Sequence, residues 1–233
     1  MIATQNKQNR FFSSESGLTL IECLVAIVVV ALTTATIAPM LVFSVATRVQ
    51  NQKTEQALQL AQAEIDKVRL IVEQGGDYGD RLFDANLSTM PATTPPVPVA
   101  RAAAPDSFIP STDSATAVTQ AREVDIDGDG ASDFAVQLFR TRGIEIPPQT
   151  PGVIRNTPVV FDVGVRVYDE RARQNINSLL IDEAGLTFVD GEGDRGRQPL
   201  AVLYSQIAQG DRDGSLCQYW RFTNGTIPPG VQC

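Results

Sequence analysis

The sequence predicts an α+β protein in which a long N-terminal helix precedes a small antiparallel β-sheet head. Residues 18 to 46 form an apolar stretch with Glu22 as its only charge, and helical spacing then continues to residue 74. Farther along, apolar and polar residues alternate in short runs, as they do in β-strands. Hydrophobic residues make up 43% and charged residues 20% of the 233-residue chain, near globular averages, so we expect the head to fold.

The apolar stretch is long enough to cross a bilayer, because about 20 apolar residues at ~1.5 Å each span a core ~30 Å thick. One interpretation is a secretory signal that is cut behind the stretch, after Ser44-Val45-Ala46. Glu22 argues against it, because a charge inside such a segment costs roughly 2.5–3.5 kcal/mol on insertion. A disposable signal gains nothing from that cost, so we expect a retained transmembrane helix.

Beyond residue 46 the helix becomes amphipathic. Apolar residues recur at steps of three and four, at Ala57, Ala61, Ile65, Val68 and Val72. Gly75-Gly76 is expected to end the helix. This divides the N-terminal region into a polar leader (1–17), a transmembrane half (18–46) and an amphipathic half (47–74).

Pro39 lies about six turns into this helix. A proline removes one backbone hydrogen bond, so we expect a kink there. The alternative is that a membrane helix merely tolerates the residue.

Residues 75 to 121 are predicted to be a low-complexity loop region. From residue 88 onward this region is rich in Pro, Ala, Ser and Thr, with Phe108 as its only aromatic residue, so we expect it to bury little. A short helix over residues 115 to 122 is the alternative.

Residues 122 to 233 are predicted to form the β-rich head. Residues 134 to 139 and 159 to 168 are the strongest strand candidates, and in the second Val163, Val165 and Val167 alternate with polar residues or glycine. This alternation predicts an antiparallel sheet that is buried on one face only. Residues 186 to 189 and 200 to 204 are weaker candidates, separated by a Gly- and Asp-rich turn at 190 to 194.

Composition argues against two classes of function. The net charge of −8 lacks the basic surface that nucleic-acid binding requires, so we expect no nucleic-acid partner. The chain has no histidine and no G-x-S-x-G, P-loop or C-x-x-C motif, and its acidic residues cluster in turns without the aromatic-rich cleft of a glycosidase. We therefore expect a protein that is not an enzyme.

Residues 125 to 133 contain acidic residues at the alternating spacing of calcium loops. Asp125, Asp127, Asp129 and Asp133 could converge on one hard cation, with Gly130 allowing the tight turn. The pattern departs from the EF-hand, which needs a bidentate Glu where this chain has Val136. The alternative is an Asp- and Gly-rich hairpin turn. Calcium is the one cofactor that this sequence suggests, and none is required.

Three cysteines divide between the two ends of the chain. Cys217 and Cys233 could form a disulfide in an oxidising compartment, worth about 3 kcal/mol by the chain-entropy argument, or remain free thiols. Cys23 lies in the apolar stretch, where we expect an inert packing residue or, alternatively, a palmitoylated one.

The segment from Gly17 through Leu18 to Glu22 resembles the prepilin family, whose signature is a Gly before the cut, a hydrophobic first mature residue and a Glu four residues later. The resemblance implies that a prepilin peptidase removes the cytoplasmic leader between Gly17 and Leu18 and N-methylates Leu18. It implies that Glu22 pairs with the new amine of a neighbouring subunit, and that Pro39 is the helix-bending proline of many pilins. The fold would be pilin-like, with the helix as a spine.

Residues 37 to 50 and 197 to 204 look like the cyanobacterial pseudopilins of hormogonium polysaccharide secretion, a resemblance that covers the helix well and the head in patches. It implies a minor pilin or pseudopilin of a type IV pilus-like or type II secretion-like machine that serves polysaccharide secretion and gliding motility. Partners would be other pilins and an inner-membrane assembly platform. The protein would cross the cytoplasmic membrane once, with its head in the periplasm or outside. A pilus-tip adhesin with a calcium-stabilised, glycan-binding head is the alternative, and a hydrolase is a more distant one.

Overall fold

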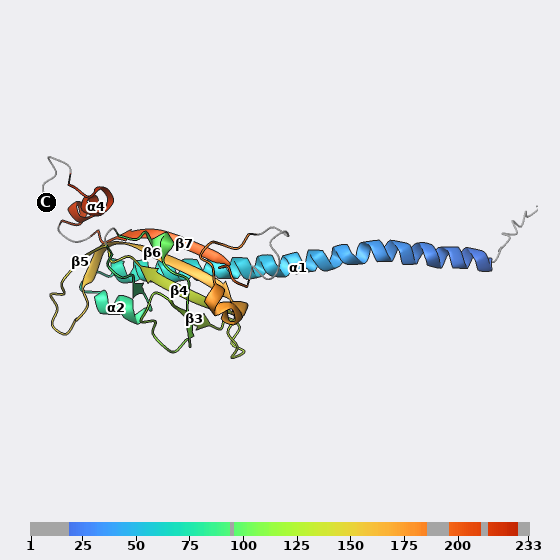
Figure 1. The fold of residues 1–233 in the computed structure, drawn as a ribbon, viewed down its shortest axis with the longest axis horizontal. Helices are drawn as coiled ribbons and strands as arrows, with labels where there is room; N and C mark the ends of the chain where they lie inside the picture. The colour runs from blue at the N-terminus through green and yellow to red at the C-terminus, as the bar shows by residue number, and fades with distance from the viewer. Residues whose placement is uncertain (1–18, 94–95, 186–195, 211–213, 228–233) are drawn as a thin grey trace, which may run out of the picture. The chain divides into compact units, whose positions relative to one another are not determined.

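The computed structural model describes residues 19–93, 96–185, 196–210 and 214–227. It shows an α+β chain with a long N-terminal helix and a seven-stranded sheet (Figure 1). The chain divides into two compact units, residues 1–50 and 51–233. The helix contributes its first part to one unit and its second part to the other.

Helix α1 (Leu20–Glu73) confirms the predicted helix to within two residues at each end of its described part. It ends where Gly75 and Gly76 adopt left-handed φ values of 68° and 72°, which glycine tolerates without strain. Pro39 lies inside α1, and the kink expected there stays a prediction.

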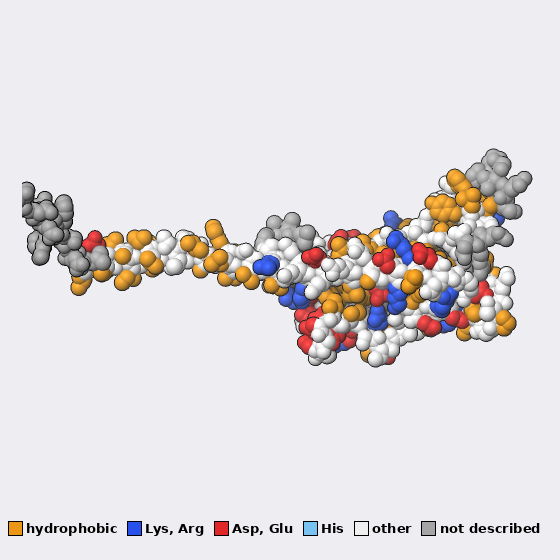
Figure 2. Space-filling view, turned by 180° about the vertical axis from the view of Figure 1, so that it is seen from behind, with side chains coloured by type: hydrophobic (Ala, Val, Ile, Leu, Met, Phe, Trp, Pro, Cys, Tyr) orange, Lys and Arg blue, Asp and Glu red, His pale blue; other side chains and the backbone are white. Residues whose placement is uncertain are grey.

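The first unit consists, in its described part, of the apolar half of α1. Every residue from 19 to 46 is exposed, and Figure 2 shows hydrophobic side chains along this half of the helix. Its mean hydropathy reaches 2.4 over an 18-residue window, so the helix is long and apolar enough to cross a membrane. That much is compatible with a single-pass membrane anchor.

Four longer strands form the centre of the head: β3 (Gln120–Val124), β4 (Phe134–Arg140), β6 (Thr157–Asp169) and β7 (Ala201–Ala208). Adjacent strands in this set are antiparallel, in the order β3, β4, β6, β7. The strand predictions at 134–139 and 159–168 are confirmed, and the one at 200–204 corresponds to the first part of β7. The candidate strand at 186–189 and the turn at 190–194 lie outside the described residues.

Three short strands complete the sheet. β5 (Ile144–Ile146) is antiparallel to β6, whereas β1 (Ser88–Thr89) pairs with β4 in parallel and β2 (Ser107–Ile109) pairs with β3 in parallel. The sheet is therefore mixed, and the prediction of a purely antiparallel sheet is wrong. Strands of two and three residues carry too little periodic pattern to be seen in sequence.

A bulge lets β5 continue the line of β4 along β6. The β5–β6 register shifts between Ile144 and Glu145. The preceding Gly143 has a φ of +64°, and a Cβ atom there would collide with the carbonyl oxygen of Val160. Only glycine fits this bend.

The main core lies between the second half of α1 and one face of the sheet. All five apolar helix positions predicted from spacing are buried, and they pack with alternate residues of β6, namely Val163, Val165 and Val167. Amphipathic spacing thus predicted the buried face of the helix correctly.

The opposite face of the sheet is also buried, so the prediction of a half-buried sheet is wrong. Twelve of the thirteen β6 residues are buried. The cover comes from the described parts of residues 88–121, which we call the covering segment; it contains the short 3-10 helix η1 (Val99–Arg101). Met90, Val99 and Ala102 from this segment pack around Phe139.

The covering segment therefore buries more than its composition predicted, and the expectation that it buries little is wrong. Three of the apolar side chains that it carries, Met90, Val99 and Ala102, pack around one buried ring. The alternative of a helix over 115–122 is also wrong, because β3 begins at Gln120. Upstream of the segment, helix α2 (Gly79–Asp84) buries Leu82 in the main core.

A single buried guanidinium fastens the covering segment to the sheet. Arg166 of β6 is fully buried, and its Nη1 and Nη2 donate to the carbonyl oxygens of Ala102 (2.8 Å) and Ala100 (3.0 Å). Nη2 also donates to the Tyr204 hydroxyl, and the guanidinium lies 4.9 Å from the centre of the Phe139 ring. All of these partners are uncharged. Backbone carbonyl oxygens therefore accept most of the hydrogen bonds that this buried guanidinium donates.

Two short helices follow the strands β6 and β7. The 3-10 helix η2 (Glu170–Ser178) directly follows β6, and the Asp169 side chain caps it by accepting from the backbone N–H of Arg171. Helix α4 (Ser215–Asn224) follows β7 and buries Cys217.

Replacing Arg166 with methionine should lower the free energy of unfolding by about 2–4 kcal/mol, because several buried carbonyls lose a charged donor. Chemical denaturation of the full chain in detergent, followed by circular dichroism, measures this. Trypsin should also cut faster after Arg101, which lies in the covering segment. Arg142→Met is the matched control, since that side chain is 58% exposed. An Arg166→Met protein as stable as the control would contradict this account.

Candidate functional site

The start of α1 is held by a reciprocal cap between Thr19 and Glu22. The Thr19 backbone N–H donates to Glu22 Oε2 (3.4 Å), and the Glu22 N–H donates to Thr19 Oγ1 (3.4 Å). This is a capping box, in which two backbone donors at a helix start are satisfied. The sequence carries the Thr-x-x-Glu pattern that predicts this cap, a local role for Glu22 beside the pairing that the resemblance implies. Gly17 and Leu18 lie outside the described residues.

The acidic loop joins β3 to β4 and is the hairpin turn that the sequence offered as an alternative. Within it, carboxylate oxygens of Asp125, Asp127 and Asp133 lie within 4.8 Å of one another. Asp129 is not part of this group. The structure thus brings together three of the four residues predicted to bind calcium.

Backbone N–H groups organise the loop. Asp125 accepts from Gly128 (2.7 Å) and Gly130 (2.9 Å), and Asp133 accepts from Ile126 (2.8 Å). The Gly130 and Gly128 bonds are the main reason that the pKa of Asp125 is lowered. Asp125 is therefore held as a carboxylate at the centre of the turn.

Asp127 behaves differently. The bond from the Asp129 N–H lowers its pKa, but partial desolvation and the negative charges of Asp129, Asp133 and Asp125 together raise it. The net direction is upward, as expected where like charges crowd. A divalent cation would relieve this repulsion, and carboxylate oxygens are the ligands that calcium prefers. These contacts also suit a plain turn, so calcium binding stays a prediction.

The cysteine in the first turn of α4 is oxidised. Cys217 is disulfide-bonded and buried, whereas Cys23 is a free, exposed thiol. Cys233, the expected partner of Cys217, lies outside the described residues, so that pairing stays a prediction.

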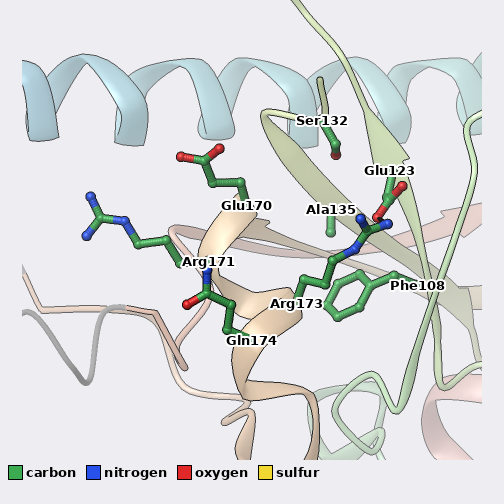
Figure 3. A pocket seen from close by; sticks show the side chains of 8 residues that line it. All are labelled: Phe108, Glu123, Ser132, Ala135, Glu170, Arg171, Arg173 and Gln174. Carbon is green, nitrogen blue, oxygen red and sulfur yellow. Dashed lines mark hydrogen bonds and ion pairs between the residues drawn. The ribbon is translucent and has the colours of Figure 1, made fainter. Parts of the chain in front are cut away.

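A polar cleft of about 530 Å³ lies beside η2 and the β3 and β4 strands (Figure 3). Arg173 extends toward Glu123 past the ring of Phe108, and the two charged groups form an ion pair. Glu170 pairs with Lys53 (3.5 Å), and Arg171 lies 3.8 Å from Asp169. Among the described residues, every charge in the cleft lining has an opposite charge nearby, so these residues leave no excess charge that would attract an ion.

Comparisons with known proteins give no match. No protein family, curated protein or solved structure matches this chain. The candidate residues therefore rest on sequence patterns and geometry. Of these, the structure places Glu22 at the start of α1 and gathers three acidic side chains in one loop.

Calcium should raise the melting temperature of the full chain in detergent by about 5 °C at a hundredfold excess over its Kd, because a ligand bound only by the folded state stabilises it. Asp125→Asn should remove most of this shift. Differential scanning calorimetry with calcium and with chelator measures both.

Asp129→Asn is the matched control for that experiment. It removes one negative charge from the same loop but lies outside the group of three, so it should keep most of the shift. If the unfolding curves of the wild type with calcium and with chelator overlap, the loop is a hairpin turn that does not bind calcium.

Proposed function

We propose that the chain is a prepilin-like structural subunit, not an enzyme, that is anchored by its N-terminal helix and works by assembling with other subunits. The observation that carries the proposal is the order of these residues in the sequence: Gly17 and Leu18 come directly before an exposed, membrane-length apolar helix, and Glu22 lies in its first turn. A conventional secretory signal does not need an acidic residue at that depth.

The finer proposal is a minor pilin or pseudopilin of a type IV pilus-like or type II secretion-like machine for polysaccharide export and gliding motility. It rests on the cyanobacterial resemblance of residues 37–50 and 197–204. Prepilin peptidase, other pilins and an inner-membrane platform would be its partners. The head would then lie in the periplasm or outside the cell. A calcium-stabilised tip adhesin is the second candidate, favoured by the three converging carboxylates.

Assembly through the helix has a physical basis. Large apolar side chains from Leu20 to Val49 are half or more exposed in the single chain, apart from Val28, and such a surface needs lipid or other helices around it. Within such surroundings, a Glu22 carboxylate gains strongly from the amine of a neighbour, because attraction rises as the dielectric constant falls. Apolar packing would supply affinity, and this pair would fix the register between subunits.

The mature protein should begin at an N-methylated Leu18 and keep its apolar helix. Mass spectrometry of the N-terminal peptide from protein expressed with its native processing machinery measures this. A mature protein that begins at Thr47 would replace the prepilin proposal with an ordinary signal peptide.

Glu22→Ala should be inserted into the membrane but should enter assemblies roughly tenfold less well or worse, because the neighbouring amine loses its charged partner. Crosslinking of subunits in membranes, compared with the wild type, measures incorporation.

The capping box supplies the control. Thr19→Ala removes the cap but leaves the carboxylate, so it should assemble nearly normally. Equal losses for Thr19→Ala and Glu22→Ala would mean that Glu22 acts only as a helix cap.

A further inference from the structure

We infer that the head binds a primary ammonium group carried on an apolar skeleton, with the carboxylate of Asp162 as its anchor. The site is a cleft of about 690 Å³ on the sheet face that the covering segment occupies. This inference concerns the head alone and does not depend on the proposed function.

The walls of the cleft are largely apolar. They come from three parts of the head that are distant in sequence: the start of the covering segment, the turn before β5, and the end of α4. Pro91, Pro96, Val97, Ile144 and Phe222 are among the residues that line it. A cleft of this size that combines apolar walls with polar side chains is typical of small-ligand sites.

Of the described residues that line the cleft, Asp162 is the one with an acidic side chain. Its backbone is fixed at the middle of β6, where its N–H donates to Thr141 Oγ1 (3.0 Å) and its carbonyl oxygen accepts from the Thr141 N–H (2.8 Å). The carboxylate is thus presented by a rigid strand and does not sit on a loop.

The Asp162 carboxylate lacks a cationic partner among the described residues. Gln206 Nε2 donates a hydrogen bond to the carboxylate oxygen Oδ1 (3.3 Å). Burial raises its pKa and the Gln206 bond offsets only part of that effect. A half-buried negative charge with a neutral partner is costly, and a cation placed beside it would remove the cost.

Two arginines line the same cleft, and neither neutralises Asp162. Arg142 Nε is 3.1 Å from Glu145 Oε2, a carboxylate that it shares with Arg140, so its ion-pair partner is Glu145 and not Asp162. Arg221 belongs to α4, and no ion pair joins it to Asp162 within the part of the chain that the structure describes. Its positive charge repels every positive charge placed in the cleft, so a ligand with one ammonium group fits better than a polycation.

The chemistry of the cleft selects among ligands. One carboxylate is too few for a metal ion, which needs several oxygen ligands. An anion would add to the negative charge of Asp162. An ammonium group donates three hydrogen bonds, and the apolar walls would bury the carbon skeleton that carries it.

The first test measures selectivity in the wild-type chain. Benzylammonium and neutral benzyl alcohol are titrated calorimetrically into the full chain in detergent, with detergent-only blanks. Benzylammonium should bind at least tenfold more tightly. Equal affinities, or no binding of either, would overturn the proposal without any variant.

The second test uses variants. Asp162→Asn keeps the shape and the Gln206 contact and should abolish the preference for the amine, whereas the exposed Asp113→Asn should keep it. Arg221→Gln should leave amine affinity unchanged or raise it. An amine preference that survives in Asp162→Asn would overturn the assignment of the anchor.

A third titration distinguishes the sources of the ammonium group. Nα-acetyl-lysine methylamide mimics a lysine side chain of a partner protein. Tighter binding of this compound than of benzylammonium would assign a protein lysine, and the reverse would assign a free amine. If neither compound binds, the proposal is overturned.

Discussion

The head depends on the burial of both faces of β6. A strand with one wet face can carry polar side chains there, but twelve of the thirteen β6 residues are buried. The residue that makes this possible is Arg166, whose guanidinium donates to the carbonyl oxygens of Ala100 and Ala102. The same bonds satisfy a buried cation and fix a segment that has little regular structure, so burial of the charge and order of the segment depend on each other.

This dependence explains which parts of the fold the sequence predicts. The helix and its buried face follow from spacing alone, because three- and four-residue steps of apolar residues have one structural solution. Burial of the second face of the sheet could not be predicted from the sequence. Around Arg166, valines alternate with polar residues or glycine, and this pattern usually marks a strand with one solvent-exposed face. The signal that was missed is chemical: an arginine between valines in a long strand needs partners, and the Ala- and Pro-rich segment supplies them as backbone carbonyls.

One of the candidate sites could be predicted from the sequence, and another could not. The three converging carboxylates follow from local spacing, since residues 125 to 133 are close in sequence and one hairpin brings them together. Asp162 could not be found in this manner. Its importance comes from what surrounds it, namely Gln206 from a neighbouring strand and apolar walls from three distant segments. Residue type and spacing do not reveal that a carboxylate is half-buried with no cationic partner among the residues that the structure describes.

The Glu22 carboxylate can either cap its own helix or pair with the amine of a neighbouring subunit, and the two free energies can be compared. As a cap it satisfies a backbone donor of its own helix, a contribution of about 1 kcal/mol in typical proteins, and the Thr19–Glu22 contacts are long at 3.4–3.5 Å. In a membrane, an uncompensated carboxylate costs roughly 2.5–3.5 kcal/mol. The second term is larger, so in the proposed assembly the carboxylate should leave its cap whenever a neighbouring amine comes within reach. In this proposal the Thr19–Glu22 cap stabilises the start of the helix in the unassembled chain, before a neighbouring subunit binds.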